Sequence, residues 1–205
     1  MIVLKIGGDI ILEGISQSLS TDLKRILTYE KLIIVHGGGD IVTDIAEKLG
    51  KPQVFIKSPS GIRSRYTDKE TVQIYTMVMA GRVNKEVVRW LLSLGIQAIG
   101  LAGIDAALIR AKRKKRLMII DDRGRRRIIE GGYTGKIVDV NSDLLRLLIE
   151  RGYLPVIAPI ALGDENEPLN VDSDRAAAHL AGALKADKII FLTEVEGIFL
   201  NGKIL

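Results

Sequence analysis

Glycine-rich turns and one lysine are the residues of this sequence whose types and spacing could do chemistry. Three apolar runs of strand length end in such turns. The glycines are Gly7 and Gly8, then Gly37, Gly38 and Gly39, then Gly100 and Gly103. Because glycine has no side chain, its backbone N–H can approach an anion closely, and the start of a following helix adds favourable partial charge. Lys5 could reach the same anion. The set favours a site that handles a phosphoryl group.

Several other chemistries are excluded by what the sequence lacks. The P-loop pattern fails because Gly135 and Lys136 are followed by Ile137, and no dinucleotide-binding glycine pattern follows the first apolar run. There is no cysteine, and the only histidines are His36 and His179, so we expect no metal site built by the chain. No apolar run reaches the roughly 18 residues of a membrane span, and no signal-peptide layout is present. We therefore expect a cytoplasmic protein.

The elements that must position these residues follow from the hydrophobic pattern. Strands with their turns are predicted at residues 2–8, 31–39, 97–103, 153–162 and 187–197. Helices are predicted before Tyr29 and at 40–50, 67–95 (interrupted near Gly81), 142–152 and 173–186. This alternation predicts an α/β fold with an open, mainly parallel sheet between layers of helices. Residues 106–129 differ, because two strand-like arms, "ALIRAKRK" and "RRRII", flank a "DDRG" turn and predict a β-hairpin lid.

Six motifs, in order along nearly the whole chain, resemble the amino acid kinase family. They are "KIGGDII", "VHGGGDIV", "GIRSRYTD", "GRVNKEVV", "LNVDSDRAAAHLA" and "LTEVEGIF". The resemblance is strongest to the acetylglutamate kinase branch. It implies a three-layer αβα fold that binds ATP, whose Mg²⁺ is held mostly by ATP itself. It also implies a single domain, residues 1–205, with 1–172 as the substrate-binding lobe and 173–205 as the start of an ATP-binding lobe. The final "GIFLNGKIL" suggests a truncated C-terminus.

The resemblance also implies roles for individual residues. Lys5 would stabilise the transferring phosphoryl group, with the first two glycine turns as backbone donors around it. Asp174 would hold the catalytic lysines. The substrate would be bound by Arg63 and Asn170, and the nucleotide by Thr193, Glu194 and Gly197. The family has a second catalytic lysine, which we expect beyond residue 205. Where acetylglutamate kinases have a further asparagine, this sequence has Asp172, which leaves that substrate contact open.

The expected mechanism is simple because the acceptor is already a nucleophile. A side-chain carboxylate has a pKa of about 4.3 and is ionised at neutral pH, so no general base is needed. The obstacle is the approach of one anion to another. We therefore expect catalysis by positioning and charge neutralisation, with an acyl phosphate as product.

A strongly basic segment, residues 112–127, selects among possible carboxylates. It holds nine Lys and Arg against two Asp, whereas the rest of the chain has a net charge of −2. Together with "YTGKI" and "KSPSGIRSRYTD", this segment resembles kinases of lysine and arginine biosynthesis. Their aminoadipate or glutamate is capped at the α-amino group by a small acidic carrier protein of the LysW type. Carrier docking is predicted at Lys112, Arg113, Lys115, Arg125 and Arg127, since a basic lid would attract an acidic partner.

Three alternatives stay open. The chain could be an acetylglutamate kinase that acts on free acetylglutamate, or a non-catalytic regulator or nucleic-acid binder on the same fold. Nucleic acid is disfavoured because no aromatic residue for base stacking lies between 111 and 129. The segment could also be a solvated hairpin without a partner. Glutamate and aminoadipate differ by one methylene, worth about 0.8 kcal/mol, so either or both could be substrates. The resemblance further implies a homodimer.

Overall fold

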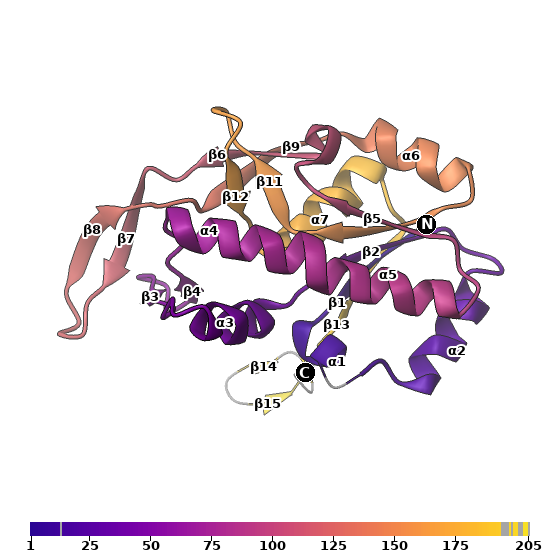
Figure 1. Ribbon diagram of the computed structural model, residues 1–205, viewed down its shortest axis with the longest axis horizontal. Coiled ribbons are helices and arrows are strands. Elements are labelled where there is room, and N and C mark those ends of the chain that lie inside the picture. The colour runs from indigo at the N-terminus through magenta and orange to yellow at the C-terminus, as the bar shows by residue number, and fades with distance from the viewer. Residues whose placement is uncertain (13, 194–196, 198, 201–202, 205) are drawn as a thin grey trace.

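A parallel sheet of five strands forms the centre of the computed structural model, which describes residues 1–12, 14–193, 197, 199–200 and 203–204. The strands, in their order across the sheet, are β13 (Lys188–Leu192), β1 (Ile2–Ile6), β2 (Leu32–His36), β10 (Leu154–Ala158) and β5 (Ala98–Ala102). All four neighbouring pairs are parallel. The carboxyl ends of β1 and β2, where the first two glycine turns begin, therefore lie side by side (Figure 1).

The central strands are buried on both faces, which is why they read as continuous apolar runs. Val3, Ile33 and Ile157 point into one hydrophobic cluster. Leu4, Ile34 and Val156 point into another on the opposite face. Each face is covered by helices, so the predicted three-layer α/β architecture is confirmed (Figure 1).

The helices divide between the two faces of the sheet. α6 (Ser142–Glu150) and α7 (Ser173–Leu184) cover the first face. The other face is covered by α1 (Gly8–Leu12), α2 (Gln17–Ile26), α3 (Gly39–Lys48), α4 (Lys69–Thr76) and α5 (Asn84–Ser93). α7 shares its cluster with strands from the N-terminal half, so the hydrophobic core has no boundary at residue 172.

The long helical region is continuous rather than interrupted near Gly81. α4 passes directly into a π-helical stretch, η1 (Met77–Val83), and then into α5. A π-helical turn widens a helix without ending it. Gly81 lies inside this stretch, where a Cβ would meet no neighbour, so it marks a wider turn and not a break.

The basic segment forms a longer ribbon than a single hairpin over 106–129. After the short 3-10 turn η2 (Asp105–Ala107), β6 (Ile109–Arg113) pairs with β9 (Gly135–Val140). β7 (Arg116–Ile120) then pairs with β8 (Arg126–Glu130) and projects from the body (Figure 1). The first predicted arm therefore pairs with 135–140, because the apolar run 117–120 supplies the true partner for 126–130. The turn at "DDRG" is confirmed.

Small sheets join this ribbon to the rest of the protein. β6 also borders β11 (Ile160–Leu162), which pairs with β12 (Pro168–Asn170). The hairpin of β3 (Phe55–Lys57) and β4 (Arg63–Arg65) meets β7. Near the C-terminus, β14 (Phe199–Leu200) pairs with β15 (Lys203–Ile204). Among the residues described, no helix is long and apolar enough to cross a membrane.

Candidate active site

The two glycine turns interlock at the carboxyl ends of β1 and β2. A Cβ built on Gly8 would lie 2.7 Å from both Cα and N of Gly38. Gly38 itself has a φ of +142°, a backbone conformation that side chains resist. The two main chains can approach this closely because residue 8 has no side chain, and glycine at 38 allows the backbone conformation of the second turn. The turns predicted to act together are therefore brought into direct contact.

Some N–H groups of the glycine turns already donate hydrogen bonds within the protein, and others are available to a ligand. Gly7 N–H donates to the Leu192 carbonyl at 3.0 Å, and Gly37 N–H donates to the Ile6 carbonyl at 2.8 Å. In the part of the chain that the structure describes, the N–H groups of Gly8, Gly38 and Gly39 have no acceptor. Three unused N–H donors therefore lie in the two interlocked turns, and Gly39 opens α3, whose N-terminal end favours an anion.

Lys5 reaches this region from the end of β1 and forms an ion pair with Asp174. Its Nζ lies 3.0 Å from Asp174 Oδ1. The Lys5 side chain is only 13% exposed, and the Asp174 side chain is 57% exposed. Asp174 is held in the first turn of α7, so the ammonium has a fixed counter-ion beside the glycine turns. The two residues predicted to be catalytic are 169 positions apart in the chain and meet here.

The predicted nucleotide-binding residues follow β13. Thr193 comes next to Gly7, since a Cβ on Gly7 would lie 4.0 Å from Thr193 Cα. Gly197 is half-buried. Glu194 lies outside the described residues. The start of this loop is thus adjacent to the first glycine turn.

The third glycine pair does not join the other two. Gly100 lies within β5, where a Cβ would come 2.0 Å from Asn84 Oδ1. A Cβ on Gly103 would come 2.3 Å from the Ile160 carbonyl oxygen. Both glycines make room for neighbouring protein atoms, so the anion site is formed by two turns and not three.

A cavity of about 550 Å³ opens beside the glycine turns. Gly37, Gly38 and Gly39 form one wall, and the underside of the β6–β9 ribbon forms another. The charged side chains of its lining are mainly basic. They are Arg63, Arg65, Lys114, Lys136 and Arg175, against the single acidic residue Asp172. This is a concave site for an anionic ligand, next to a place for a phosphoryl group.

Three of these cations were not singled out from the sequence. Lys114, Lys136 and Arg175 have no counter-ion in the described parts of the chain. Burial, and secondarily the charge of Arg175, lowers the pKa of Lys114, because both disfavour the ammonium. A bound anion would relieve this cost. The signal for these residues was present in "AKRKK", "YTGKI" and "SDRAAA", but only the fold shows that they face the same cavity.

Arg63 and Arg65 differ in role although both lie on β4. The Arg63 guanidinium stacks 3.8 Å above the ring of Phe55 and remains exposed at the cavity wall. Arg65 is buried and donates to the Gly39 carbonyl at 2.7 Å and to Thr43 Oγ1 at 2.9 Å. Arg63 is thus free to bind a ligand, whereas Arg65 anchors the second glycine turn.

Asn170 and Asp172 flank the entrance to α7. Asn170 Nδ2 donates to Thr67 Oγ1 at 2.9 Å, and the residue lines the cavity. Asp172 is the N-cap of α7 and accepts a hydrogen bond from the Arg175 backbone N–H at 2.9 Å. Asn and Asp cap helices about equally well. Asp172 therefore provides a cap that an asparagine could also provide, and it adds a negative charge to the cavity.

Two of the five predicted docking residues are paired inside the hairpin. Arg125 and Arg127 lie 3.0 and 2.9 Å from the same carboxylate oxygen of Asp121. The backbone N–H of Arg125 is the main reason that the pKa of Asp121 is lowered, and the arginine side chains contribute. These arginines are structural members of the turn as well as positive charges.

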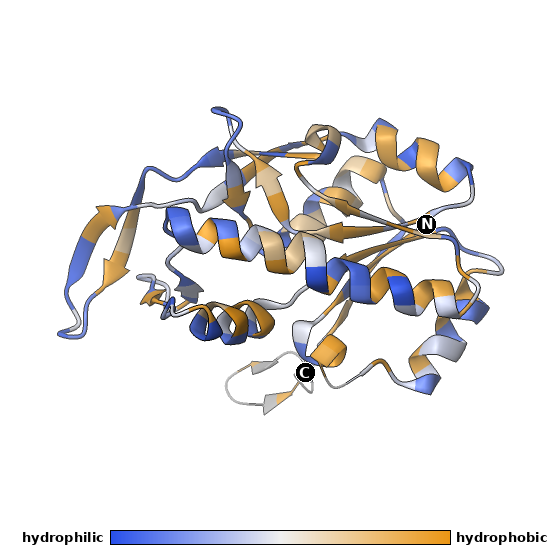
Figure 2. Cartoon of the chain, viewed as in Figure 1, coloured by the Kyte–Doolittle hydropathy of each residue, from blue (hydrophilic) through white to orange (hydrophobic). Residues whose placement is uncertain are grey.

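The other three docking candidates lie nearer the base of the ribbon. Arg113 stacks 4.1 Å from the ring centre of Tyr133 and lies 3.8 Å from a Glu130 oxygen. Lys112 and Lys115 are exposed, and the described residues give them no ionic partner. Figure 2 shows the projecting hairpin as hydrophilic at its tip, with hydrophobic stretches along its strands. Unpaired basic side chains therefore lie at the base of the ribbon and also along the hairpin, where Arg116, Arg123 and Arg126 are exposed and have no ion pair among the described residues.

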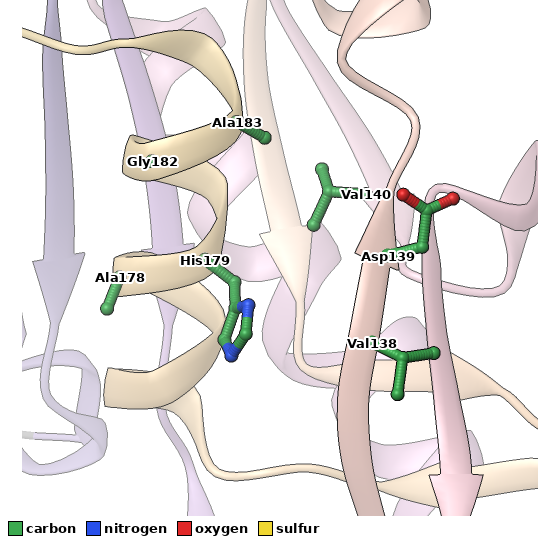
Figure 3. Close-up of a pocket in the computed structure, with 7 residues that line it drawn as sticks. All are labelled: Val138, Asp139, Val140, Ala178, His179, Gly182 and Ala183. Carbon is green, nitrogen blue, oxygen red and sulfur yellow. The ribbon is translucent and has the colours of Figure 1, made fainter.

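A second hollow, of about 430 Å³, lies between β9 and α7. Figure 3 shows the imidazole of His179 extending from α7 toward β9, with Val140 and Ala183 beside it. The only acidic or basic residue that lines this hollow, apart from His179, is Asp139, and none of the glycine turns borders it. The His179 ring is the one side chain of this lining that could donate to a phosphoryl group, and no basic residue lines it, so this hollow is a poor candidate for the site of transfer.

A metal ion has few ligands available from the described residues, which contain no group of three or more His, Asp or Glu able to hold one. Free backbone N–H groups and an ammonium suit phosphate oxygens instead. Mg²⁺ commonly keeps phosphate and water ligands. The donor set thus fits the phosphate oxygens of a nucleotide, and a magnesium ion, if bound, would be held chiefly by those phosphates.

Comparison with known proteins agrees with this geometry. Residues 1–204 match the amino acid kinase family. The chain belongs to that family. A protein of Nitrosopumilus maritimus, named a putative [LysW]-aminoadipate/[LysW]-glutamate kinase, is 51% identical over 205 residues, covering all of this chain and 76% of the relative. The [LysW]-aminoadipate/[LysW]-glutamate kinase of Saccharolobus solfataricus is 47% identical over 207 residues, with the same coverage.

Two solved structures share the fold of this chain. A protein of Streptococcus mutans has a TM-score of 0.80 at 26% identity, and the match covers all of this chain and 76% of that one. An isopentenyl phosphate kinase structure has a TM-score of 0.60 at 21% identity, covering 97% of this chain and 73% of the other. The amino acid kinase fold predicted from the sequence is confirmed, and the protein is a phosphotransferase of the amino acid kinase type.

Proposed function

We propose that this amino acid kinase uses ATP to phosphorylate the side-chain carboxylate of aminoadipate or glutamate while a LysW-type carrier caps the α-amino group. The observation that carries the proposal is the cation-rich cavity under a basic ribbon. An acetyl cap has no charge, so one arginine for the α-carboxylate would suffice. Unpartnered Lys114, Lys136 and Arg175 suit a substrate whose cap brings further carboxylates. Relatives at 45–52% identity that carry this name support the same conclusion.

The chain's own groups would act by positioning and charge neutralisation. ATP, when bound, supplies the phosphoryl group that the substrate carboxylate accepts. Lys5, held by Asp174, would neutralise charge on that group, and the N–H groups of Gly8, Gly38 and Gly39 would bind its oxygens. Arg63 would bind the substrate α-carboxylate from the cavity wall. Asn170 would orient the same end of the substrate.

The proposal also assigns the two substrates to different parts of the chain. Residues 1–172 contribute most of the cavity and would bind the amino acid. Residues 173–205 would begin the ATP-binding part, with Thr193, Glu194 and Gly197 near the phosphates. Two copies would pair as a homodimer, by resemblance to the family. The product would serve a biosynthetic route to lysine or arginine.

The proposal is tested with the full-length protein, ATP and hydroxylamine, which traps an acyl phosphate as a hydroxamate. The acceptors are carrier-bound aminoadipate, carrier-bound glutamate and free N-acetylglutamate. We expect hydroxamate from the carrier-bound amino acids, with kcat/KM at least about 100-fold above that for N-acetylglutamate, because buried polar groups left unpaired are penalised strongly. Equal turnover of N-acetylglutamate would identify an acetylglutamate kinase instead.

Docking is tested by charge reversal at positions that do not stabilise the hairpin. In Lys112→Glu/Lys115→Glu, both exposed unpartnered lysines change sign. The control, Lys24→Glu/Arg25→Glu, makes the same change in net charge on the exposed face of α2. We expect carrier-bound kcat/KM to fall about tenfold in the first variant, mainly through KM, and less than about twofold in the control. Equal effects would refute docking on the ribbon.

A further inference from the structure

A buried histidine lies directly behind the second glycine turn. His36 ends β2, is 0% exposed, and does not line the cavity. Its Nδ1 lies 2.9 Å from the Gly37 carbonyl oxygen. Its Nε2 lies 3.2 Å from Nδ2 of Asn84, the first residue of α5. One ring thus joins a predicted phosphate-binding turn to the long helix.

The partners of Asn84 decide which ring nitrogen carries the proton. Asn84 Nδ2 also donates to the Val156 carbonyl at 2.9 Å, and Asn84 Oδ1 accepts from Lys85 Nζ at 2.9 Å. In the reverse amide orientation, Oδ1 would face the Val156 carbonyl oxygen, and two acceptors would repel. The amide therefore donates to His36 Nε2, and the proton lies on Nδ1. Burial lowers the pKa of His36 to about 4, which keeps the ring neutral.

The hydrogen bond from His36 to the Gly37 carbonyl also fixes the direction of the next N–H group, that of Gly38. The chain has no cis peptide among its described residues, so the Gly37 carbonyl and the Gly38 N–H point in opposite directions. Because the carbonyl is bound to the buried ring, the Gly38 N–H faces away from the interior. Gly38 lines the cavity, and its N–H is one of the free donors.

We propose that His36 is a positioning residue, which Asn84 fixes in the Nδ1–H tautomer so that it holds the Gly37–Gly38 peptide with the Gly38 N–H toward the transferring phosphoryl group. Lys85 completes the arrangement, since it also donates to the Gly100 carbonyl at 3.2 Å and thereby ties Asn84 to β5. Gly100 leaves the space that the Asn84 side chain occupies. This inference rests on the proposed phosphoryl transfer for its kinetic part only.

The tautomer is measured directly by long-range ¹H–¹⁵N NMR of imidazole nitrogens in the full-length protein. His36 and His179 are the two histidines of these 205 residues, so His179→Gln removes the other signal of this part of the protein and simplifies the assignment of His36. We expect a neutral ring with the proton on Nδ1 at pH 7. A proton on Nε2, or a charged ring, would overturn the proposal without any need for a folded His36 variant.

Kinetics then separate positioning from mere stability. We expect kcat to fall about 100-fold in His36→Leu, as for loss of one oriented backbone donor, with KM changed less than about threefold. His36→Asn retains a donor near the Gly37 carbonyl and should keep more activity. Asn84→Asp replaces the donor with an acceptor, which should move the proton to Nε2 and lower kcat in parallel.

Leu145→Ala is the control for lost packing, because Leu145 is fully buried in the cluster on the opposite face of the sheet. It should lower the unfolding temperature and leave kcat within about twofold below that temperature. A folded His36→Leu protein that keeps wild-type kcat would overturn the positioning role. Absence of acyl phosphate from the wild type would instead overturn the proposed function, while the NMR spectrum would still decide the tautomer.

Discussion

At the scale of single residues, the chemistry depends on a few groups held from several directions. Lys5 is fixed by Asp174, the Gly8 and Gly38 main chains touch, and Arg65 and His36 anchor the second turn from behind. In the proposed mechanism none of these groups acts as a base. Their common effect would be to hold positive charge and N–H donors in place before substrates arrive, which would reduce reorganisation during transfer.

The Lys5–Asp174 pair gives a test of coupled function. Lys5→Met should lower kcat by about 1,000-fold, because a cation that stabilises a phosphoryl transition state contributes at that level. Asp174→Asn should lower kcat by about 100-fold through lost orientation of Lys5. The double variant should be no slower than Lys5→Met alone, since residues that act as a unit are not additive. Hydroxamate assays measure all three, and additive losses would show that the residues act separately.

His36 makes stability depend on pH. Its folded pKa of about 4 lies below the unfolded value of 6.5, so the unfolded chain binds the proton first. The contribution of the neutral ring is complete above pH 6.5 and is lost as pH falls through 4, a change of about 3 kcal/mol. Urea unfolding at pH 7 and pH 4.5 should therefore show a larger loss of unfolding free energy in the wild type than in His36→Leu. Equal losses would contradict a buried neutral imidazole.

At the scale of elements, two devices position the site. The N-terminus of α7 carries Asp174 and begins at the cap Asp172, and the β7–β8 hairpin extends the cavity wall outward. The helix is packed in the core, whereas the hairpin projects from it. A substitution in α7 should therefore change the stability of the whole protein. A substitution in the hairpin should change only the local opening of the hairpin.

Two variants separate the capping hydrogen bond of α7 from the negative charge of Asp172. Asp172→Asn keeps an oxygen for the Arg175 N–H and should leave the unfolding free energy within about 0.5 kcal/mol. Asp172→Ala should lose about 1 kcal/mol. Chemical denaturation distinguishes the two variants. A similar loss in both would mean that the negative charge, and not the cap, stabilises this end of the helix.

The turn of the hairpin depends on Asp121. Its carboxylate accepts hydrogen bonds from the backbone N–H groups of Arg123 and Arg125, and Gly124 has a φ of +74°. In Asp121→Ala, amide hydrogens of residues 116–130 should exchange faster, while the global unfolding midpoint moves little. Hydrogen exchange followed by mass spectrometry measures the exchange rates of residues 116–130, and chemical denaturation measures the midpoint. Unchanged exchange would show that strand pairing alone holds the hairpin.

At the scale of the whole molecule, charge is distributed unevenly. The basic segment stands on one projecting ribbon, and the remaining chain is slightly acidic. Such a distribution steers an acidic partner to one place and leaves the rest of the surface without attraction for it. The ribbon also roofs the cavity, so docking and substrate delivery would occur at one end of the molecule.

Salt should separate docking from chemistry. As ionic strength rises from about 0.05 to 0.3 M, kcat/KM for the carrier-bound substrate should fall steeply while kcat stays nearly constant, because screening weakens encounter. Lys112→Glu/Lys115→Glu should flatten this dependence, and Lys24→Glu/Arg25→Glu should not. Steady-state assays at several salt concentrations test this. A steep slope retained in the ribbon variant would place recognition elsewhere.

The sequence alone determined the strands, the glycine turns, Lys5, the turn at "DDRG" and the family. These are local patterns, because a buried parallel strand, a strand-to-helix turn and a hairpin turn each depend on neighbouring residues. The sequence also indicated a basic lid, although it paired the wrong arms, since register is a contact between distant segments.

Only the tertiary structure decided which of these residues work together. Lys114, Lys136 and Arg175 face one cavity because the ribbon folds over α7, and Asn84 reaches His36 because β2 lies beneath the long helix. It also showed that Gly7 and Gly37 have no N–H to spare. Hydrogen bonds and burial between distant segments carry no signature at any one position. Only the folded chain therefore shows that part of the basic stretch lines a cavity and that His36 contacts the second glycine turn.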